Sequence, residues 1–218
     1  MDPLSLFPLL NYFCILMDGK QSEIKEIIDR EIDGIRNIPV DQNILNAIEL
    51  IHHQVHSKKG KVIVTGIGKA GQIGHNIATT FSSTGTPAVF LHPSEAQHGD
   101  LGVIQENDIL FLISNSGKTR EILELIPLAK KLFPDIKSIA ITGHPENDLG
   151  TQVDVCLSTG YPKEVCPLGL TPTTSTTVMT VLGDVIVIML MKKIGFTKAD
   201  YARRHHSGYL GQKSRVDE

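Results

Sequence analysis

Short apolar runs alternate with helical segments through the middle of the chain, and this alternation constrains the fold more than any other feature. Five runs are rich in β-branched residues and apolar at almost every position; they lie at 61–65, 87–91, 108–113, 138–142 and 153–157. Strands that are apolar on both faces are typical of a parallel sheet covered by helices. Helical patterns lie between these runs at 69–83, 119–133 and 147–150. Such helices supply the crossovers that parallel strands need, so the sequence predicts an α/β fold.

Helical periodicity also flanks this alternating region. Isoleucines recur at three- and four-residue spacing from Ile24 to Ile35, and Asp41 offers an N-cap for a second helix toward His56. Segment 174–194 is apolar nearly all round, which predicts a helix buried between the sheet and another subunit. Gly195 is expected to end that helix, and a short last helix is expected at 197–204.

The first 17 residues are strongly apolar, but they contain two prolines and no basic segment. They therefore match neither a secretory signal nor a membrane span. Two interpretations stay open: an apolar leader that packs on the domain or a partner subunit, which we favour, or a physiological start at Met17. We divide the chain into a leader at 1–19, one domain at 20–213 and a C-terminal tail at 214–218.

Composition narrows the classes of function. The chain has 21 Lys and Arg against 24 Asp and Glu, and this net charge of −3 disfavours non-specific nucleic-acid binding. Tryptophan is absent and aromatic residues make up 5%, which argues against base stacking. Three scattered cysteines without a C-x-x-C pair are typical of reduced thiols. We expect a cytoplasmic protein with neither a nucleic-acid nor a membrane partner.

Two loops rich in glycine or hydroxyl groups follow predicted strands and precede predicted helices. Residues 66–71 read GIGKAG, and Lys69 adds a positive charge that a dinucleotide-binding loop does not require. Residues 114–119 read SNSGKT, but Leu112 stands where an ATP-binding P-loop needs glycine. Both loops are expected at the carboxyl ends of parallel strands, where such sheets bind ligands. We interpret them as phosphate-binding loops, with ordinary helix capping as the alternative for the second.

Four stretches of the chain resemble the arabinose 5-phosphate isomerases, a family of enzymes built on the sugar isomerase (SIS) domain. They read GIGKAGQIGHNIATTFSSTGTPAVFLHPSEAQHGDLG at 66–102, ISNSGKTREI at 113–122, KEVCPLGLTPTTSTT at 163–177 and RRHHSGYLG at 203–211. The resemblance implies a SIS-type three-layer sandwich, with a five-stranded parallel sheet flanked by helices. It also implies a homotetramer, although a dimer stays open, with sites shared between subunits. The chain is most similar to the short form of the family, without CBS repeats.

The resemblance also implies an activity. This is the reversible aldose–ketose isomerisation of D-ribulose 5-phosphate and D-arabinose 5-phosphate through an enediolate, which supplies Kdo for lipopolysaccharide or capsule. No cofactor is required for it. Two alternatives stay open. One is a non-catalytic sensor of a phosphosugar or nucleotide sugar on the same fold, and the other is an isomerase for a different sugar phosphate such as sedoheptulose 7-phosphate.

The same resemblance assigns four catalytic residues. Lys69 would stabilise the enediolate, and Glu164 is the first choice for the general base. Glu121 shares the proton transfers, and its role against that of Glu164 stays open. His205 would open the sugar ring or shuttle a proton, reaching into the site of a neighbouring subunit.

Substrate contacts are assigned to a further set of residues. These are Gly68, Gly85, Thr86, His92, His98, Ser114, Asn115, Ser116 and Thr119. His92 is also assigned a possible inhibitory zinc ion that the reaction does not need. The other histidines, His144 among them, are interpreted as surface or core residues. The chain departs from the family pattern at three places, which are Ala70, Lys118 and the pair His206-Ser207.

Overall fold

The computed structural model of the protein describes residues 7–215, with side chains from residue 19 onward. Their centre is a five-stranded parallel sheet with the strand order β2-β1-β3-β4-β5. The strands are β1 (Val62–Gly66), β2 (Ala88–Phe90), β3 (Ile109–Ile113), β4 (Lys137–Thr142) and β5 (Val155–Ser158). Each predicted strand is confirmed, with its ends displaced by at most two residues.

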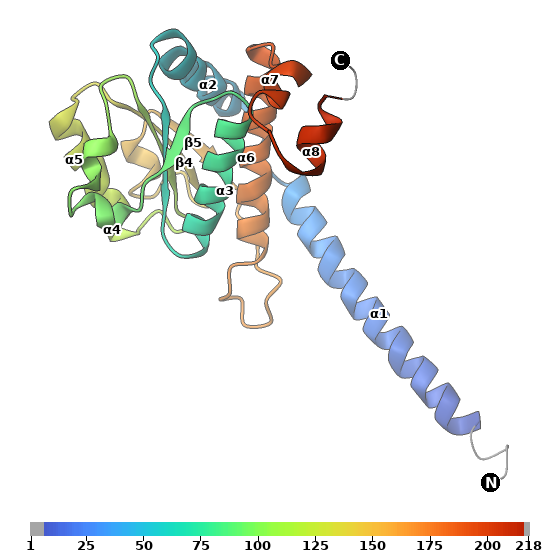
Figure 1. The fold of residues 1–218 in the computed structure, drawn as a ribbon. Coiled ribbons are helices and arrows are strands. Elements are labelled where there is room, and N and C mark those ends of the chain that lie inside the picture. The colour runs from blue at the N-terminus through green and yellow to red at the C-terminus, as the bar shows by residue number, and fades with distance from the viewer. Residues whose placement is uncertain (1–6, 216–218) are drawn as a thin grey trace.

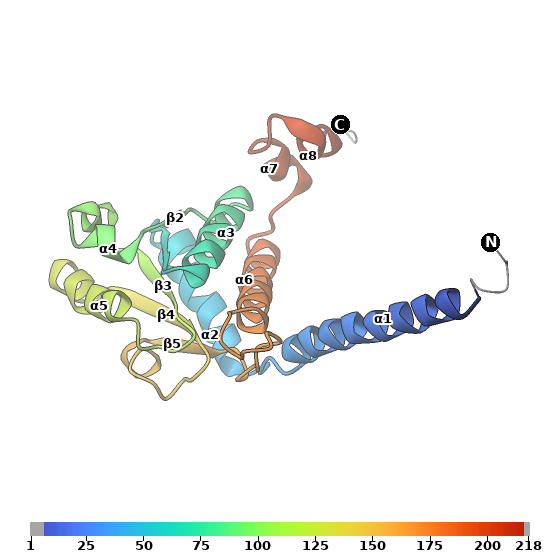
Figure 2. The same cartoon turned by 90° about the horizontal axis from the view of Figure 1, so that it is seen from below.

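Helices cover both faces of the sheet because successive strand residues point to opposite sides (Figures 1 and 2). Val64 and Phe111 belong to one buried core, whereas Ile63 and Leu112 belong to the other. The first core is closed by α2 (Gln42–Ile51), α3 (Lys69–Ser83) and α6 (Thr174–Lys193), and the second by α4 (Pro93–Ala96) and α5 (Arg120–Leu132). The predicted three-layer α/β sandwich is confirmed.

Helix α6 is the apolar helix that the sequence predicts at 174–194. Gly195 ends it as predicted: its φ is +63°, its N–H donates to Lys192, and the N–H of Phe196 donates to Met191. Among the described residues, α6 is the one helix long and apolar enough to span a membrane. Half of its most apolar stretch is buried inside the protein, as in the core helix of a globular domain.

One side of α6 stays uncovered in the single chain. Val185, Ile188 and Met189 are 37%, 50% and 36% exposed, whereas Leu182 and Ile186 are buried. The predicted packing of α6 against the sheet side of the domain is therefore confirmed by the first core. Its packing against a second subunit stays a prediction.

The N-terminal segment forms a longer helix than expected. Helix α1 (Phe7–Arg36) is continuous across the predicted boundary between the leader and the domain. Its first half projects away from the sandwich, and its end lies beside α6 (Figures 1 and 2). Residues 7–17 therefore extend away from their own domain, and packing of the leader on a partner subunit stays a prediction, while residues 1–6 lie outside the described part.

The shorter elements complete the fold. Asp41 caps α2 as predicted, accepting from the N–H of Asn43 at 2.9 Å, and a π-helical turn (His52–Ser57) follows α2. The helix expected at 147–150 is instead a 3-10 turn (Gly150–Gln152). The helix expected at 197–204 is α7 (Lys198–Ala202). The sequence analysis missed α4, a 3-10 turn (Asp100–Val103) and α8 (Gly208–Lys213).

Candidate active site

The two predicted phosphate loops meet at the carboxyl edge of the sheet. One follows β1 and the other follows β3, which are neighbours, and the strand order reverses between them. Parallel sheets of this order bind ligands in the crevice at that reversal. A pocket of about 580 Å³ lies there, which is a volume typical of small-molecule sites. Both loops line it, and so does the first turn of α6 through Ser175 and Thr176.

The loop 114–119, called the serine loop below, is held in shape by its own hydroxyl groups. Ser114 Oγ lies 2.8 Å from Thr119 Oγ1 and accepts from the N–H of Gly117 at 3.2 Å. The N–H of Lys118 donates to Ser116 Oγ. Thr119 is the N-cap residue of α5, yet its side chain makes no capping hydrogen bond. Ordinary capping therefore does not account for these hydroxyls, and the arrangement suits a phosphate group.

The charges around the pocket favour an anion. Lys69 begins α3 and lines the pocket, after Gly68, whose φ of +61° favours glycine. Lys118 of the serine loop also lines it, as does Ala70, which brings no hydroxyl group. In the described part of the chain, the lining holds no carboxylate. Two lysines in the lining favour the binding of an anion there.

Glu164 lies directly behind the pocket, at the N-terminus of α6. Its Oε2 accepts hydrogen bonds from the N–H and hydroxyl of Thr173, at 2.7 and 3.0 Å, and from the N–H of Ser175 at 3.3 Å. Burial by itself would raise the pKa of Glu164, but the hydrogen bonds from Ser175 and Thr173 outweigh burial and hold the pKa below its usual value. The carboxylate is therefore ionised at neutral pH. Glu164 does not line the pocket itself but contacts Ser175, which does.

The remaining acid and the two predicted histidines do not line the pocket. Glu121 is half-buried in the first turn of α5, next to the serine loop. His92 and His98 flank α4 beyond the edge strand β2, and both are exposed. No group of three or more potential metal ligands occurs among the described residues. Zinc binding by His92 therefore stays a prediction.

Gly85 and Thr86 lie at the opposite edge of the sheet. Helix α3 starts at the carboxyl edge and returns the chain to the amino edge before β2 begins. There Thr86 is buried, with its Oγ1 3.1 Å from His56 Nε2, and a Cβ added to Gly85 would meet Phe196. Gly85 and Thr86 therefore do not line the pocket of their own chain, and their contact with substrate stays a prediction.

His205 is also remote from the pocket of its own chain. It follows α7, beyond the C-terminal end of α6, whereas the pocket lies at the N-terminal end (Figure 1). A helix of 20 residues separates the two ends by roughly 30 Å. The His205 ring stacks on Tyr201 with centroids 3.7 Å apart, and its Nδ1 lies 3.1 Å from the Tyr201 carbonyl oxygen. Reach into a neighbouring subunit stays a prediction.

His144 is a lining residue that the sequence analysis missed. It follows β4, so it lies at the same carboxyl edge as the serine loop. No motif marks the turn after this strand. The signal available in the sequence was topological, because every polar residue just after a parallel strand belongs to this edge.

Comparisons with known proteins agree with this geometry. Residues 55–189 match the family model of the SIS domain. Among curated relatives, the arabinose 5-phosphate isomerase KdsD of Salmonella typhi is 45% identical over 189 residues, or 87% of this chain and 56% of that protein. KdsD of Francisella tularensis is 48% identical over 201 residues, or 91% and 61%. The chain thus spans little more than half the length of these relatives.

Two solved structures resemble the fold closely. A candidate phosphosugar isomerase involved in capsule formation from Bacteroides fragilis is 60% identical, with a TM-score of 0.86 over 88% of this chain and 100% of that one. The E. coli CFT073 protein c3406 in complex with arabinose 5-phosphate is 33% identical, with a TM-score of 0.77 over 94% and 100%. The predicted resemblance to the arabinose 5-phosphate isomerases is confirmed, and the chain belongs to the SIS-domain family.

Proposed function

We propose that the protein interconverts D-arabinose 5-phosphate and D-ribulose 5-phosphate. The observation that carries this proposal is the pocket at the β1–β3 reversal, where the serine loop and Lys69 converge and no described carboxylate lines the wall. Relatives named arabinose 5-phosphate isomerase support the choice of substrate, as does the structural neighbour in complex with arabinose 5-phosphate.

In this proposal the serine loop receives the phosphate, and the sugar carbons extend toward α6 and Lys69. The reaction removes a proton next to the carbonyl group and returns it to the neighbouring carbon through an enediolate. Lys69 offsets the negative charge of that intermediate. Glu164 is ionised and therefore able to accept the proton. Its Oε2 is anchored by three donors, which fixes the carboxylate beside the pocket. Glu121 is the alternative base.

We propose that the site is completed by a second copy of the chain in a homotetramer, which brings His205 to a neighbouring pocket. Exposed apolar side chains on α1 and α6 support self-association, because they form faces that one chain leaves open. On α1 these are Ile24 and Ile28, which are 57% and 51% exposed, and on α6 they are Val185, Ile188 and Met189.

The product would feed Kdo synthesis for lipopolysaccharide or capsule in the cytoplasm. The capsule branch is supported by the description of the Bacteroides fragilis protein. We propose that turnover needs no cofactor. Zinc would bind through His92 as an inhibitor that the reaction does not need.

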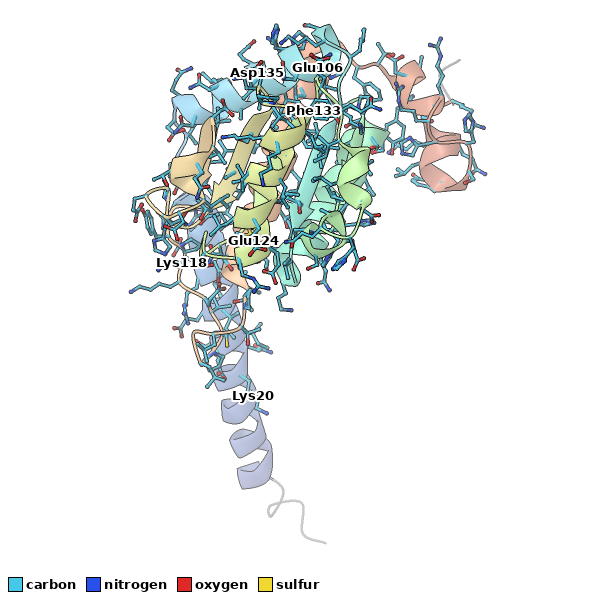
Figure 3. All side chains as sticks on the ribbon, turned by 90° about the vertical axis from the view of Figure 1, so that its left-hand side faces the viewer. Lys20, Glu106, Lys118, Glu124, Phe133 and Asp135 are labelled. Atoms are coloured by element: carbon cyan, nitrogen blue, oxygen red, sulfur yellow. The ribbon has the colours of Figure 1, made fainter. Side chains whose placement is uncertain are left out.

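The test is an isomerase assay on the purified chain. We expect conversion of D-arabinose 5-phosphate to D-ribulose 5-phosphate in the presence of EDTA, followed by NMR or a ketose colour reaction. Glu164→Gln keeps the shape of the side chain and removes the base, so kcat should fall by about 100-fold or more. Glu106→Gln is the matched control, since Glu106 is exposed at the far edge of the sheet (Figure 3), and its kcat should not change.

Each outcome of this assay separates the alternatives. If Glu164→Gln keeps full activity, Glu121 is assigned as the base instead, and Glu121→Gln tests that assignment. If the chain binds the sugar phosphate without turning it over, the sensor is favoured and the isomerase is rejected. Turnover of sedoheptulose 7-phosphate in preference to the pentose phosphates would reassign the substrate within the same class of reaction.

A further inference from the structure

A basic group lies on each side of the serine loop. Lys69 follows β1, His144 follows β4, and β3 with the serine loop lies between these two strands. Both side chains line the same pocket as the loop. The proposed function uses Lys69 and the loop but leaves His144 without a role. Its position beside the hydroxyl groups points to the phosphate end of the pocket.

Two neighbours contact the ring of His144, whose side chain is 54% exposed. Its Nδ1 lies 3.7 Å from Glu146 Oε1, and the hydroxyl of Tyr161 donates to Glu146 Oε2 at 2.7 Å. The Tyr161 ring packs edge-on against the imidazole, with centroids 4.7 Å apart. The hydrogen bond from Tyr161 holds the pKa of Glu146 below its usual range, so this carboxylate is charged. With Nδ1 facing Glu146, Nε2 is the ring nitrogen left for a ligand.

The backbone of Tyr161 adopts an unusual conformation beside His144. Its φ is +58°, a left-handed conformation that bulky side chains rarely adopt. Such residues persist where surrounding contacts hold them, and they cluster at ligand sites. The contacts that hold Tyr161 are those to Glu146 and His144. The left-handed Tyr161 therefore lies against both the histidine and the carboxylate that faces it.

The turn that carries His144 is tied to the serine loop. The N–H of Gly143 donates to the carbonyl oxygen of Asn115 at 3.0 Å, and Asn147 Nδ2 donates to that of Ser116 at 2.9 Å. The N–H of Asn147 in turn donates to the carbonyl oxygen of His144 at 3.0 Å. The position of His144 is therefore fixed relative to the hydroxyl groups of the loop.

We propose that His144 binds the phosphate group of the substrate through Nε2, and that Tyr161 and Glu146 are positioning residues for this contact. The inference rests on the proposed function for the identity of the sugar phosphate. The role is one of binding, because the phosphate is remote from the carbons that exchange a proton. Loss of the contact should raise KM and leave kcat unchanged, as expected when an interaction is equal in the ground and transition states.

The experiment is titration calorimetry with two probes, D-arabinose 5-phosphate and inorganic phosphate, beside steady-state kinetics. His144→Ala should raise Kd for both probes by about tenfold or more, the effect of a hydrogen bond to a charged group. His144→Gln keeps a donor near Nε2 and should recover most of the affinity. Tyr161→Phe removes one hydrogen bond and keeps the ring, so Kd should rise by roughly two- to threefold with kcat unchanged.

The control is His53→Ala, an exposed histidine in the turn that follows α2, outside the pocket. It should bind both probes like the parent protein. Unchanged Kd values for His144→Ala would overturn the proposal, as would a loss of kcat at constant KM. A third outcome is that the parent protein binds both probes but turns over no substrate, while His144→Ala raises both Kd values. The isomerase is then rejected and the phosphate contact stands. If the parent protein binds neither probe, both proposals are wrong.

Discussion

The two edges of the sheet carry similar polar residues with different surroundings. At the amino edge, Asp108 is buried before β3 and accepts from Lys61 Nζ at 2.6 Å and from the N–H groups of Lys61 and Gln105, both at 2.8 Å. At the carboxyl edge, Asn115 and Ser116 are exposed in the serine loop. Figure 3 shows Glu106 and Asp135 at one end of the sandwich and Lys118 at the other.

The difference shows which polar groups serve stability and which are available to a ligand. A buried group must be paired within the fold, because an unpaired one costs free energy. The amino edge meets this requirement at Asp108. At the carboxyl edge the residues of the two loops line a pocket of about 580 Å³. Substitutions should therefore affect stability at one edge and binding or catalysis at the other.

The largest expected effect is on stability, at Asp108. Asp108→Ala removes the carboxylate that accepts from three donors and leaves Lys61 without its partner, so the free energy of unfolding should fall by about 3 kcal/mol or more. Urea unfolding followed by circular dichroism measures it. The kcat and KM of the remaining folded protein should not change.

The matched control for Asp108 is an exposed ion pair. Asp29→Ala breaks the contact with Lys25 on α1, which should cost about 0.5 kcal/mol or less. If Asp108→Ala lowers the free energy of unfolding no more than Asp29→Ala does, the buried pair at the amino edge contributes no more to stability than an exposed ion pair.

The next effect is catalytic, at Lys69. Lys69→Met should lower kcat by about 100-fold, the effect of removing one group that stabilises developing charge. Because Lys69 is exposed, the free energy of unfolding should change by less than about 0.5 kcal/mol. Lys61→Met is the opposite case, since it should lower stability and leave kcat unchanged. If both substitutions act mainly on stability, the carboxyl edge is not the catalytic edge.

The sequence predicts the sheet and the serine loop well for one physical reason. Buried parallel strands are recognised by composition, and parallel pairing places every carboxyl end at one edge. This brings Lys69 and Ser114 together although 45 positions separate them in the chain. His144 shares the edge by the same rule, but it was missed because its turn carries no glycine- or serine-rich motif.

The motif at Gly85 and Thr86 does not show by itself that these residues lie far from the pocket of their own chain. A helix that crosses between parallel strands starts at the carboxyl edge and ends at the amino edge, so residues after α3 cannot line the pocket at its start. His205 shows a different limit, because its proposed contact with a neighbouring copy cannot be derived from one chain. The direction of α1 is a third feature that the sequence does not predict. Periodicity indicates that a segment is helical, but it does not indicate where the helix points relative to the domain.

A pair of threonines tests the placement of Thr86 at the amino edge, away from the pocket of its own chain. Thr86→Val removes the buried hydroxyl next to His56 and should lower the free energy of unfolding by about 1 kcal/mol, with KM unchanged. Thr119→Val removes a hydroxyl that lines the pocket and should raise KM by roughly two- to tenfold. Thermal unfolding and steady-state kinetics separate these effects. A raised KM for Thr86→Val at unchanged stability would return Thr86 to the site.

The smallest effect is chemical and distinguishes two thiols near the carboxyl edge. Cys156 lies within β5, where burial, followed by the charges of Glu146 and Asp41, raises its pKa to about 11. Cys166 lies in the loop after β5, where hydrogen bonds from Thr171, Leu170 and Leu168 lower its pKa to about 6. Since the thiolate is the nucleophile, Cys166 should be alkylated at neutral pH and Cys156 should not.

The measurement is alkylation by iodoacetamide from pH 5 to pH 9, with each cysteine quantified by mass spectrometry in a Cys14→Ser background. The rate at Cys166 should reach half of its maximum near pH 6 and fall as the pH drops further, because the lowered pKa keeps the thiolate above that pH. Thr171→Val removes the hydroxyl that contributes most to this shift, so the midpoint should move upward. Equal midpoints for Cys166 and Cys156 would contradict the expectation. The loop donors would then not be ordered around the sulfur, and the walls of the pocket near Pro172 would be less fixed than the serine loop.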